Sequence, residues 1–368
     1  MPRTRTYPGI LYHIDERKGS LERWQWLGAW ERGEKGVERE WNHALYTYVN
    51  DYNACEISCK PHHEPLIADV AILEKRAERL LLLEQWYHER ESHPVRSETR
   101  AKLLQVLSNE PYQGVVDVQL YRRLYYMKSG ITHREDRIEK ERLTFYKQQG
   151  RWGISNIVHD VPERKPIILG DSMSDENGSA LNKPLLNREL LYPGIPARPS
   201  RYRREDAVAY ADRWWDSGNP EFEEFDVNCT NYISQCLFAG GAPINYTGRR
   251  ESGWWYRGYV GGRELWSFSW AVSHSLQNYL AHARTGLTAT LVDSPSELQL
   301  GDVIFYDWDG DGRYQHSTIV TGFDAGGMPL VNANTVSSRH RYWDYKDSYA
   351  WTTATRYRFF HISDTLGT

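Results

Sequence analysis

Cys229 and His316 are the two residues whose types and surroundings predict chemistry. Cys229 lies in the run FDVNCTNYISQCLFAGG, and His316 lies in the run QHSTIVTG. A thiol attacks a carbonyl carbon as its thiolate, and the N-terminus of a helix favours the thiolate through the helix dipole. We predict that Cys229 stands at such a helix start and that His316, on a strand, is the base that takes its proton. The alternatives are an ordinary buried cysteine and an ordinary strand histidine.

The residues around Cys229 predict the helix that it would begin. Asp226 or Asn228 can cap a helix there, and Gly240–Gly241 would end it. The first N–H groups of a helix have no partner inside the helix, so those of Cys229 and its neighbours would be available to an oxyanion. His316 lies between two polar residues rather than in an apolar run, which favours a strand edge that faces a cleft.

Two asparagines on the next predicted strand are candidates for the group that orients the imidazole. Asn332 and Asn334 are two residues apart in VNANT, so both side chains point to the same face of a strand. An asparagine serves this purpose in the Cys-His-Asn variant of the triad. The residues alone leave both asparagines open, together with the reading that they form a turn.

The elements that must position these residues begin at Arg203. The sequence predicts a helix over 203–215, the helix that starts at Cys229, and a third helix from Ser269. Strand patterns follow at 301–307, 315–322, 329–335 and 355–362. A helix with a cysteine at its start, followed by an antiparallel sheet with a histidine on its second strand, is the plan of a papain-like catalytic core.

Four blocks of this region resemble one family. They occur in the order NCTNYISQCLFAGGAP, SWAVSHSLQNYL, LGDVIFYDWDGDGRYQHSTIVTG and VNANT. They resemble the putative amidase domain family of spore-forming and related Gram-positive bacteria, a relative of the NlpC-type cell-wall peptidases. The resemblance covers about residues 203–362. It implies a papain-like fold, with Cys229 as nucleophile and His316 as base, and it gives Cys236 no functional role.

Two departures from this family matter for the site. The motif around the nucleophile usually reads Asp-Cys-Thr-Asn-Phe-Val-Ser-Gln-Cys, and here Asn228 stands in the first position. The later strand block commonly reads Ala-His-Thr, and here it reads Ala333–Asn334–Thr335. The alignment therefore makes Asn334 the third triad member, with Asn332 in reserve. A family that is named for a presumed activity implies a reaction class and no substrate.

Other conspicuous residues have both a functional and a structural reading. Trp254, Trp255 and Tyr256 lie between the Cys229 helix and the next one, where we expect them to wall a cleft. Trp254 and Trp255 are our candidates for substrate contacts, and packing of the loop is the alternative. Cys236 falls in the apolar stripe of its helix and is predicted to be a core residue.

Two clusters raise the question of a metal. The run DWDGDG at 307–312 matches the front half of a calcium loop, but Thr318 stands where such a loop needs a glutamate, so an acidic hairpin turn is favoured. Cys55 and Cys59 with His62–His63 lack the spacing of a zinc knuckle and fit a helix face. We expect no metal site and no cofactor, because acyl transfer by a thiol requires neither.

Residues 1–161 predict a separate α+β domain of unknown role. Apolar residues recur at helical spacing from Leu21 to Trp30, and a long amphipathic helix is predicted over 66–90. A further helix is predicted from Ser97 to Leu107. Alternation over 116–126 predicts a strand, and a hairpin is predicted over 143–158.

The charge runs predict exposed surfaces, and the prolines predict the boundary between the two domains. The runs at 74–79 and 134–142 are predicted to be solvated helix faces. Residues 162–202 contain repeated prolines and predict a linker. The catalytic domain is then 203–368, and the fold class is α+β in both domains.

Composition limits the function classes. The chain has 368 residues, enough for about two domains, and 40% of them are hydrophobic. A net charge of -4 argues against a general binder of nucleic acid or of a membrane surface. No apolar run approaches a membrane span, and no apolar core of a signal peptide follows the basic N-terminus. Cytoplasmic location is the default expectation, with a spore or cell-wall compartment as the alternative.

The residues therefore predict a cysteine-dependent amide or peptide hydrolase. Its substrate would be a peptide or another amide, including peptidoglycan-derived peptides. Two alternatives stay open. The same triad would serve an acyltransferase, and a papain-like core that has lost turnover would serve as a module that binds a peptide or a glycan.

Overall fold

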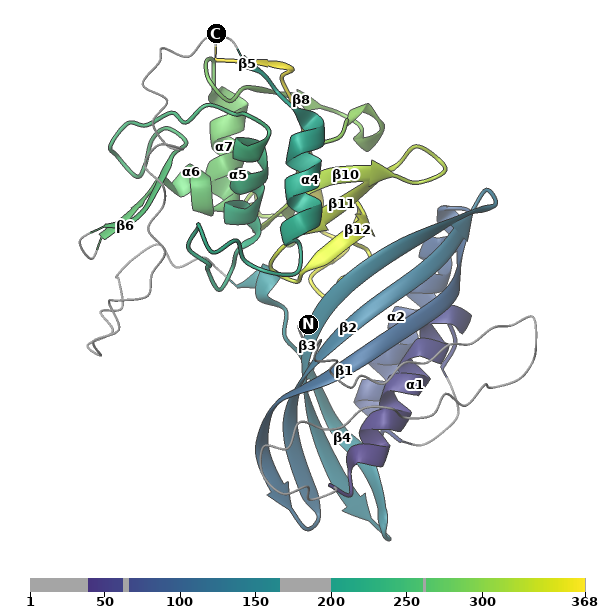
Figure 1. Ribbon diagram of the computed structural model, residues 1–368. Coiled ribbons are helices and arrows are strands. Elements are labelled where there is room, and N and C mark those ends of the chain that lie inside the picture. The colour runs from purple at the N-terminus through teal and green to yellow at the C-terminus, as the bar shows by residue number, and fades with distance from the viewer. Residues whose placement is uncertain (1–38, 62–65, 166–199, 261–262, 368) are drawn as a thin grey trace, which may run out of the picture. The chain divides into compact units, whose positions relative to one another are not determined.

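The computed structural model describes residues 39–61, 66–165, 200–260 and 263–367. The chain divides into two compact units, Met1–Asp160 and Val161–Thr368. Both contain helices and antiparallel strands, which confirms the predicted α+β class (Figure 1). Among the described residues no helix is long and apolar enough to cross a membrane.

The described part of the first unit contains two helices and a four-stranded antiparallel meander. Its elements are α1 (Asn42–Ser58), α2 (Val70–Glu89), β1 (Ser92–Glu110), β2 (Gln113–Lys128), β3 (Ile131–Gln148) and β4 (Arg151–His159). Asp69 caps α2 by accepting hydrogen bonds from the amides of Ala71 and Ile72. The core lies between α1 and the sheet, where Trp41 and Tyr48 pack on Val116, Val118 and Phe145. The predicted strand at 116–126 and the hairpin at 143–158 are confirmed.

The predicted helix from Ser97 to Leu107 is wrong, because these residues belong to strand β1. Two irregularities in the pairing with β2, at Leu103/Gln105 and Val106/Ser108, interrupt the alternation of side chains. Apolar residues then recur at a spacing that imitates a helix. Pairing with β2, which is a long-range interaction, makes this segment a strand. The local pattern of apolar residues does not reveal that pairing.

The charged run at 134–142 is also part of a strand, β3, and not a solvated helix face. Glu135, Asp136 and Glu141 are buried. Arg122 on the neighbouring strand pairs with Glu139 and Glu141 at 2.8 Å and 3.0 Å. The charges therefore satisfy one another across strands, which makes their burial possible.

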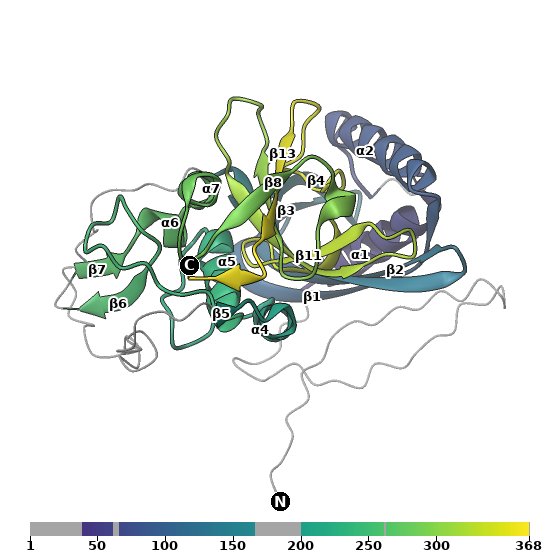
Figure 2. The same ribbon diagram turned by 90° about the horizontal axis from the view of Figure 1, so that it is seen from above.

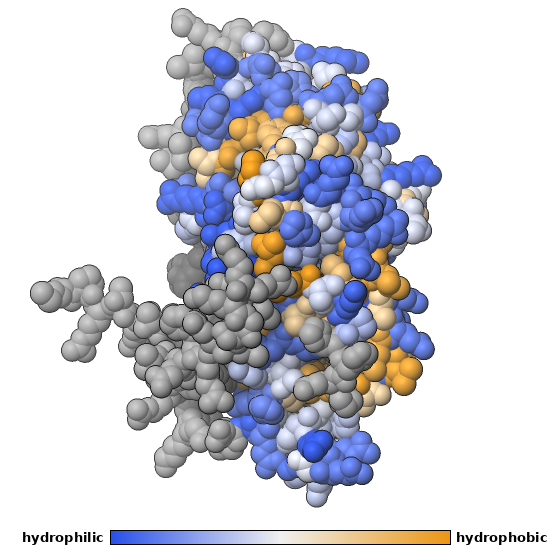
Figure 3. Space-filling view, turned by 90° about the vertical axis from the view of Figure 1, so that its right-hand side faces the viewer, coloured by the Kyte–Doolittle hydropathy of each residue, from blue (hydrophilic) through white to orange (hydrophobic). Residues whose placement is uncertain are grey.

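The surface of the first unit includes apolar side chains on α2. Val70, Leu73 and Leu81 are all more than two-fifths exposed. One face of the molecule, seen in Figure 3, carries orange apolar patches between blue hydrophilic residues. The predicted helical residues from Leu21 to Trp30 and the pair His62–His63 lie outside the described residues.

The second unit contains the elements that position the candidate site. Its helices are η1 (Pro162–Arg164), α4 (Arg204–Trp214), α5 (Cys229–Ala239), α6 (Phe268–Ala271), α7 (Ser273–His282) and η2 (Pro295–Glu297). Its strands are β5 (Ser200–Arg201), β6 (Tyr256–Val260), β7 (Arg263–Trp266), β8 (Ala289–Val292), β9 (Val303–Asp307), β10 (His316–Phe323), β11 (Pro329–Ala333), β12 (Ser338–Tyr342), β13 (Arg356–Ile362) and β14 (Thr365–Leu366). Most of the predicted linker lies outside the described residues.

Six of these strands pair antiparallel in the order β12, β11, β10, β9, β13, β8. The helices α4 and α5 pack on β10 and β11, as Figure 1 shows for β10 and Figure 2 for β11. A large apolar core fills the space between the helices and this face of the sheet, and a smaller aromatic cluster covers the other face. The sheet therefore has two buried faces with different neighbours.

Candidate functional site

Cys229 is the first residue of α5, where the sequence predicted it. The side chain is fully buried. Its Sγ lies 3.7 Å from Oγ1 of Thr230. The helix ends at Gly240, and Gly241 adopts a positive φ of 93°, which a residue with a Cβ would adopt only with strain.

The N-terminus of α5 is capped from a distant segment and not by its own N-cap side chain. Asn228 makes no capping hydrogen bond to the helix, and the sequence prediction of a local cap by Asp226 or Asn228 is therefore wrong. Instead, Oγ1 of Thr335 accepts from the amides of Cys229 at 2.8 Å and of Asn228 at 3.2 Å. The Cys229 amide, which we expected to be available to an oxyanion, has this hydroxyl as its partner.

Asn334 contacts the same turn of α5. Its Oδ1 accepts a hydrogen bond of 3.0 Å from Nδ2 of Asn228. Its Nδ2 donates to the carbonyl oxygens of Trp214, Trp215 and Ser217 at 2.8–3.3 Å. Asn228 and Asn334, which both depart from the family motif, are thus direct partners, and Asn334 has no hydrogen bond with His316.

His316 is the first residue of β10 and is fully buried in an aromatic box. The box consists of Tyr306, Trp308 and Tyr345, whose ring centroids lie 5.4–5.8 Å from that of His316. Neither ring nitrogen has a hydrogen-bond partner among the described residues. Burial, and to a lesser extent the positive charge of Arg341, lowers the pKa of His316 to about 3, so the ring is neutral at neutral pH.

The residues that follow Cys229 and His316 meet, but the imidazole points away from α5. Side chains alternate along a strand, and Ser317 faces α5, where its Oγ lies 3.2 Å from Oγ1 of Thr230. His316 therefore points to the opposite face, into the aromatic cluster. No hydrogen bond joins the thiol of Cys229 to the imidazole in the part of the chain that the structure describes.

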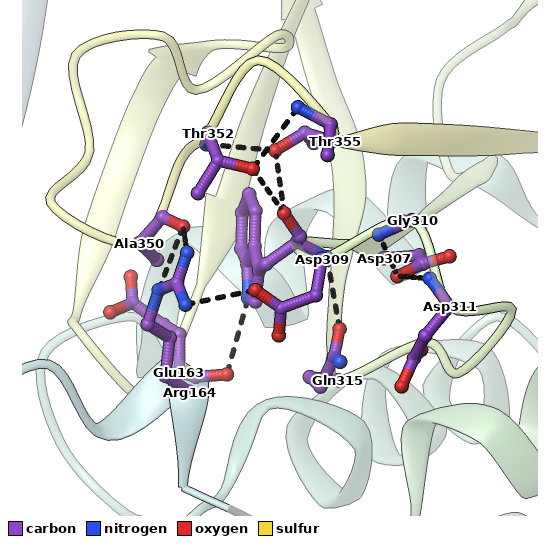
Figure 4. A network of polar contacts seen from close by, with 12 residues as sticks. Glu163, Arg164, Asp307, Asp309, Gly310, Asp311, Gln315, Ala350, Thr352 and Thr355 are labelled. Carbon is purple, nitrogen blue, oxygen red and sulfur yellow. Dashed lines mark hydrogen bonds and ion pairs between the residues drawn. The ribbon is translucent and has the colours of Figure 1, made fainter.

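A short strap, defined as residues 161–165 and containing η1, packs on the aromatic cluster through Val161, and Figure 4 shows the contacts of Glu163 and Arg164. The carbonyl oxygen of Glu163 accepts a hydrogen bond from Nε1 of Trp308 at 3.2 Å. Arg164 donates to the carbonyl oxygen of Ala350 at 2.8 Å and 3.0 Å and pairs with Asp309 at 3.0 Å. The backbone of Trp308 is held as well, because its amide donates to Oε1 of Gln315.

Asn332, the reserve candidate, belongs to a different cluster. Its Nδ2 donates to Asp212 of α4 at 3.0 Å, and its Oδ1 accepts from Thr321 and from the amide of His340. Burial alone would raise the pKa of Asp212, but hydrogen bonds from His340, Arg339 and Asn332 lower it to about 2. Asn332 therefore ties β11 to α4.

The aromatic residues that we expected to line a cleft are buried. Trp254 is fully buried, donates from Nε1 to Oγ of Ser234 at 3.0 Å and packs on Trp270 at 4.9 Å between ring centroids. Trp255 is 2% exposed, and its Nε1 donates to the carbonyl oxygens of Arg249 and Ser252. The structure places neither indole where a substrate could contact it, and packing of the loop accounts for both.

The remaining candidates have structural partners. Cys236 is fully buried in the core, and burial raises the pKa of its thiol well above the usual range. The carboxylate of Asp307 accepts from the amides of Gly310, Asp311 and Gly312, so it organises the hairpin turn (Figure 4). Cys55 lies in α1, and Cys59 follows its end with a positive φ of 52°.

Thr335 and the strap are features of the site that sequence reasoning missed. Thr335 is separated from Cys229 by 106 residues, so no local pattern links the two. The only signal was its place in the block VNANT, directly after Asn334.

Comparison with known proteins finds a family match for residues 201–360. They match the family described as "Putative amidase domain". The resemblance inferred from the motifs is confirmed. This amidase domain covers most of the second unit and contains Cys229, His316, Asn334 and Thr335.

Two relatives come from Bacillus subtilis (strain 168). The uncharacterized protein YhbB is 52% identical over 167 residues, which are 45% of this chain and 52% of YhbB. The uncharacterized protein YjcM is 27% identical over 123 residues, which are 31% of this chain and 26% of YjcM. The chain thus spans about half the length of YhbB and about a quarter of YjcM.

One solved structure was also found to be similar. The intermembrane space region of the chloroplast protein ARC6 matches with a TM-score of 0.23 and 12% identity, over 34% of this chain and 98% of that one. A TM-score this low carries no argument about fold or function.

Proposed function

We propose that the second unit is a cysteine-dependent amide hydrolase with a papain-like core and Cys229 as its nucleophile. The observation that carries the proposal is the placement of Cys229 at the first residue of α5, packed on the strand that His316 begins. The match to an amidase domain supports amide hydrolysis as the general class of reaction. The substrate class that we propose is a peptide or another amide, including cell-wall-type peptides.

The reaction would proceed through a thioester. The thiolate of Cys229 attacks the amide carbonyl carbon, while His316 takes the thiol proton and then gives it to the leaving amine. Water then attacks the thioester carbonyl with His316 as base, which releases the carboxylic acid and restores the thiol. An acyltransferase would differ only in the second step, where an amine would replace water.

The geometry requires a movement before this chemistry. His316 must leave the aromatic box and reach the α5 side of the sheet, because its nitrogens now have no polar neighbour. The Cys229 amide has Thr335 as its partner, so another N–H group in the first turn of α5 would have to bind the oxyanion. We therefore infer that the described arrangement is a resting state.

One observation favours a second candidate function. The thiol and the imidazole are not hydrogen-bonded, and Asn334 binds Asn228 instead of orienting His316. A domain with these contacts and no movement would bind a peptide or a glycan without turnover. The buried indoles of Trp254 and Trp255 do not support an aromatic binding face for that candidate.

Turnover by the full chain tests the hydrolase directly. A library of peptide amides would be incubated with the parent protein, with Cys229→Ala and with the matched control Cys236→Ala, which removes the other thiol of the same helix. The proposal predicts amide cleavage by the parent and the control and none by Cys229→Ala. Cleavage that survives Cys229→Ala would contradict it, and capture of an added amine in the product would identify a transferase.

A further inference from the structure

The turn that follows β11 holds the first turn of α5 by three hydrogen bonds. We call Asn334 and Thr335 the clamp. Thr335 accepts from the amides of Cys229 and Asn228, and Asn334 accepts from the side chain of Asn228, all within 3.2 Å. Asn228, Cys229 and Asn334 are all less than a tenth exposed. Thr335 itself is half-buried, so its partners limit the access of water to these contacts.

The first turn of α5 depends on the clamp because it has no cap of its own. The side chain of Asn228 faces away from the helix amides, and its Oδ1 accepts from the amide of Phe225 and from Nδ2 of Asn231. Buried backbone amides without a partner are strongly disfavoured. Without the hydroxyl of Thr335, the amides of Asn228 and Cys229 would have to find other partners, and the turn would rearrange.

The orientation of Asn334 is fixed from the other side. Its Nδ2 donates to three carbonyl oxygens at the end of α4, so a flip of the amide would set its oxygen against those carbonyls. Its Oδ1 is thereby presented to Asn228. The clamp thus joins the end of α4, the end of β11 and the start of α5 at Cys229.

We propose that Thr335 and Asn334 are positioning residues for the Cys229 thiol and act through the backbone of α5. Thr335 fixes the residue that carries the thiol, and Asn334 fixes the residue before it. Neither would need to contact the substrate or His316. The proposal relies on the proposed function only for the consequence that this positioning serves catalysis.

The pH dependence of Cys229 alkylation in the full chain tests the clamp without any substrate. The parent, Thr335→Val and Thr335→Ser would react with iodoacetamide between about pH 5 and pH 9, and mass spectrometry would follow the Cys229 peptide. Valine keeps the shape but removes the acceptor, and serine restores it. Thr288→Val is the matched control, because it removes a half-buried hydroxyl whose hydrogen bond to Ser363 lies outside these contacts.

We expect Thr335→Val to slow Cys229 alkylation at neutral pH roughly three- to tenfold and to move the profile to higher pH, because a displaced first turn stabilises the thiolate less. Thr335→Ser should restore the parent profile, and Thr288→Val should not change it. A profile for Thr335→Val that matches the parent, or a change that Thr335→Ser does not reverse, would overturn the proposal.

Failure of the proposed function would look different. Suppose that the parent cleaves no amide, but that the pH profile of Cys229 alkylation shifts in Thr335→Val and recovers in Thr335→Ser. The positioning role of the clamp would then hold, and the proposed hydrolase activity would be wrong. Suppose instead that the parent cleaves amides, but that the pH profile of Cys229 alkylation is the same in Thr335→Val. The hydrolase activity would then hold, and the positioning role of the clamp would be wrong.

Discussion

At the scale of single residues, Asn228 and Asn334 form a matched pair. Both stand where the sequence differs from the motif of the family that it resembles, and their side chains meet at 3.0 Å. Replacing the family's residue at only one of these two buried positions would leave the side chain at the other position without a matching hydrogen-bond partner. A contact between them means that each replacement has to suit the other.

The coupling of this pair is measurable in a double-mutant cycle. Asn228→Asp alone places a carboxylate oxygen against Oδ1 of Asn334, and Asn334→His alone places an imidazole against the amide of Asn228. We expect each to cost about 1–3 kcal/mol in the free energy of unfolding. The double variant pairs a carboxylate with an imidazole, so its loss should be smaller than the sum by about 1 kcal/mol or more. Urea denaturation of all four proteins provides the values, and additivity would contradict the coupling.

The buried His316 predicts how stability depends on pH. Its pKa is about 3 in the fold and about 6.5 in an unfolded chain, so the unfolded state binds the proton more readily between these values. The contribution is fully present above pH 6.5 and is lost as the pH falls toward 3. We expect the parent to lose about 2 kcal/mol of unfolding free energy between pH 7 and pH 5 relative to His316→Gln. Equal losses in the two proteins would show that the ring is not held neutral in the box.

At the scale of elements, the strap explains how His316 stays buried. The carbonyl oxygen of Glu163 accepts from Trp308, and Arg164 bonds to Ala350 and Asp309, so we expect Arg164 to help to hold the strap over Trp308. Nothing in the residues 161–165 predicts this placement, because the partners at 308, 309 and 350 lie about 145 or more residues away.

Removal of the arginine should expose the histidine. We expect Arg164→Ala to increase the rate at which diethyl pyrocarbonate modifies His316 about tenfold, because local opening becomes easier when three hydrogen bonds are lost. Arg313→Ala removes an exposed arginine from the adjacent turn and is the control. Mass spectrometry of the His316 peptide measures both rates. Equal rates for the two variants would mean that the strap does not cover the box.

The elements also show which predictions a sequence supports. The helix that starts at Cys229 and the strands that carry His316 and Asn332 were predicted, because apolar periodicity and the glycine stop are local signals. Strand β1 was predicted as a helix, since its bulges disturb the alternation. The clamp and the strap join residues far apart in sequence, and no local pattern carries that information.

At the scale of the molecule, each unit has its own core. The core of the first unit is built from α1 and its meander, and those of the second cover the two faces of the six-stranded sheet. All residues that we propose for catalysis and positioning belong to the second unit. The first unit contributes none of them, so its role has to be sought in its own surface and its buried charge network.

The central claim, that Cys229 is an activated nucleophile served by His316, is tested most directly by competition among the four cysteines of the full chain. All four are buried and free, so they start from similar exposure. A limiting amount of iodoacetamide at mildly acidic pH would be applied briefly to the parent and to His316→Ala, and mass spectrometry would map the labelled thiols. The account predicts that Cys229 is labelled first in the parent, because labelling proceeds through the state in which His316 has left the aromatic box and takes the thiol proton, and that this preference is lost in His316→Ala. Labelling of Cys229 no faster than Cys236, or a preference unchanged by the loss of His316, would contradict it.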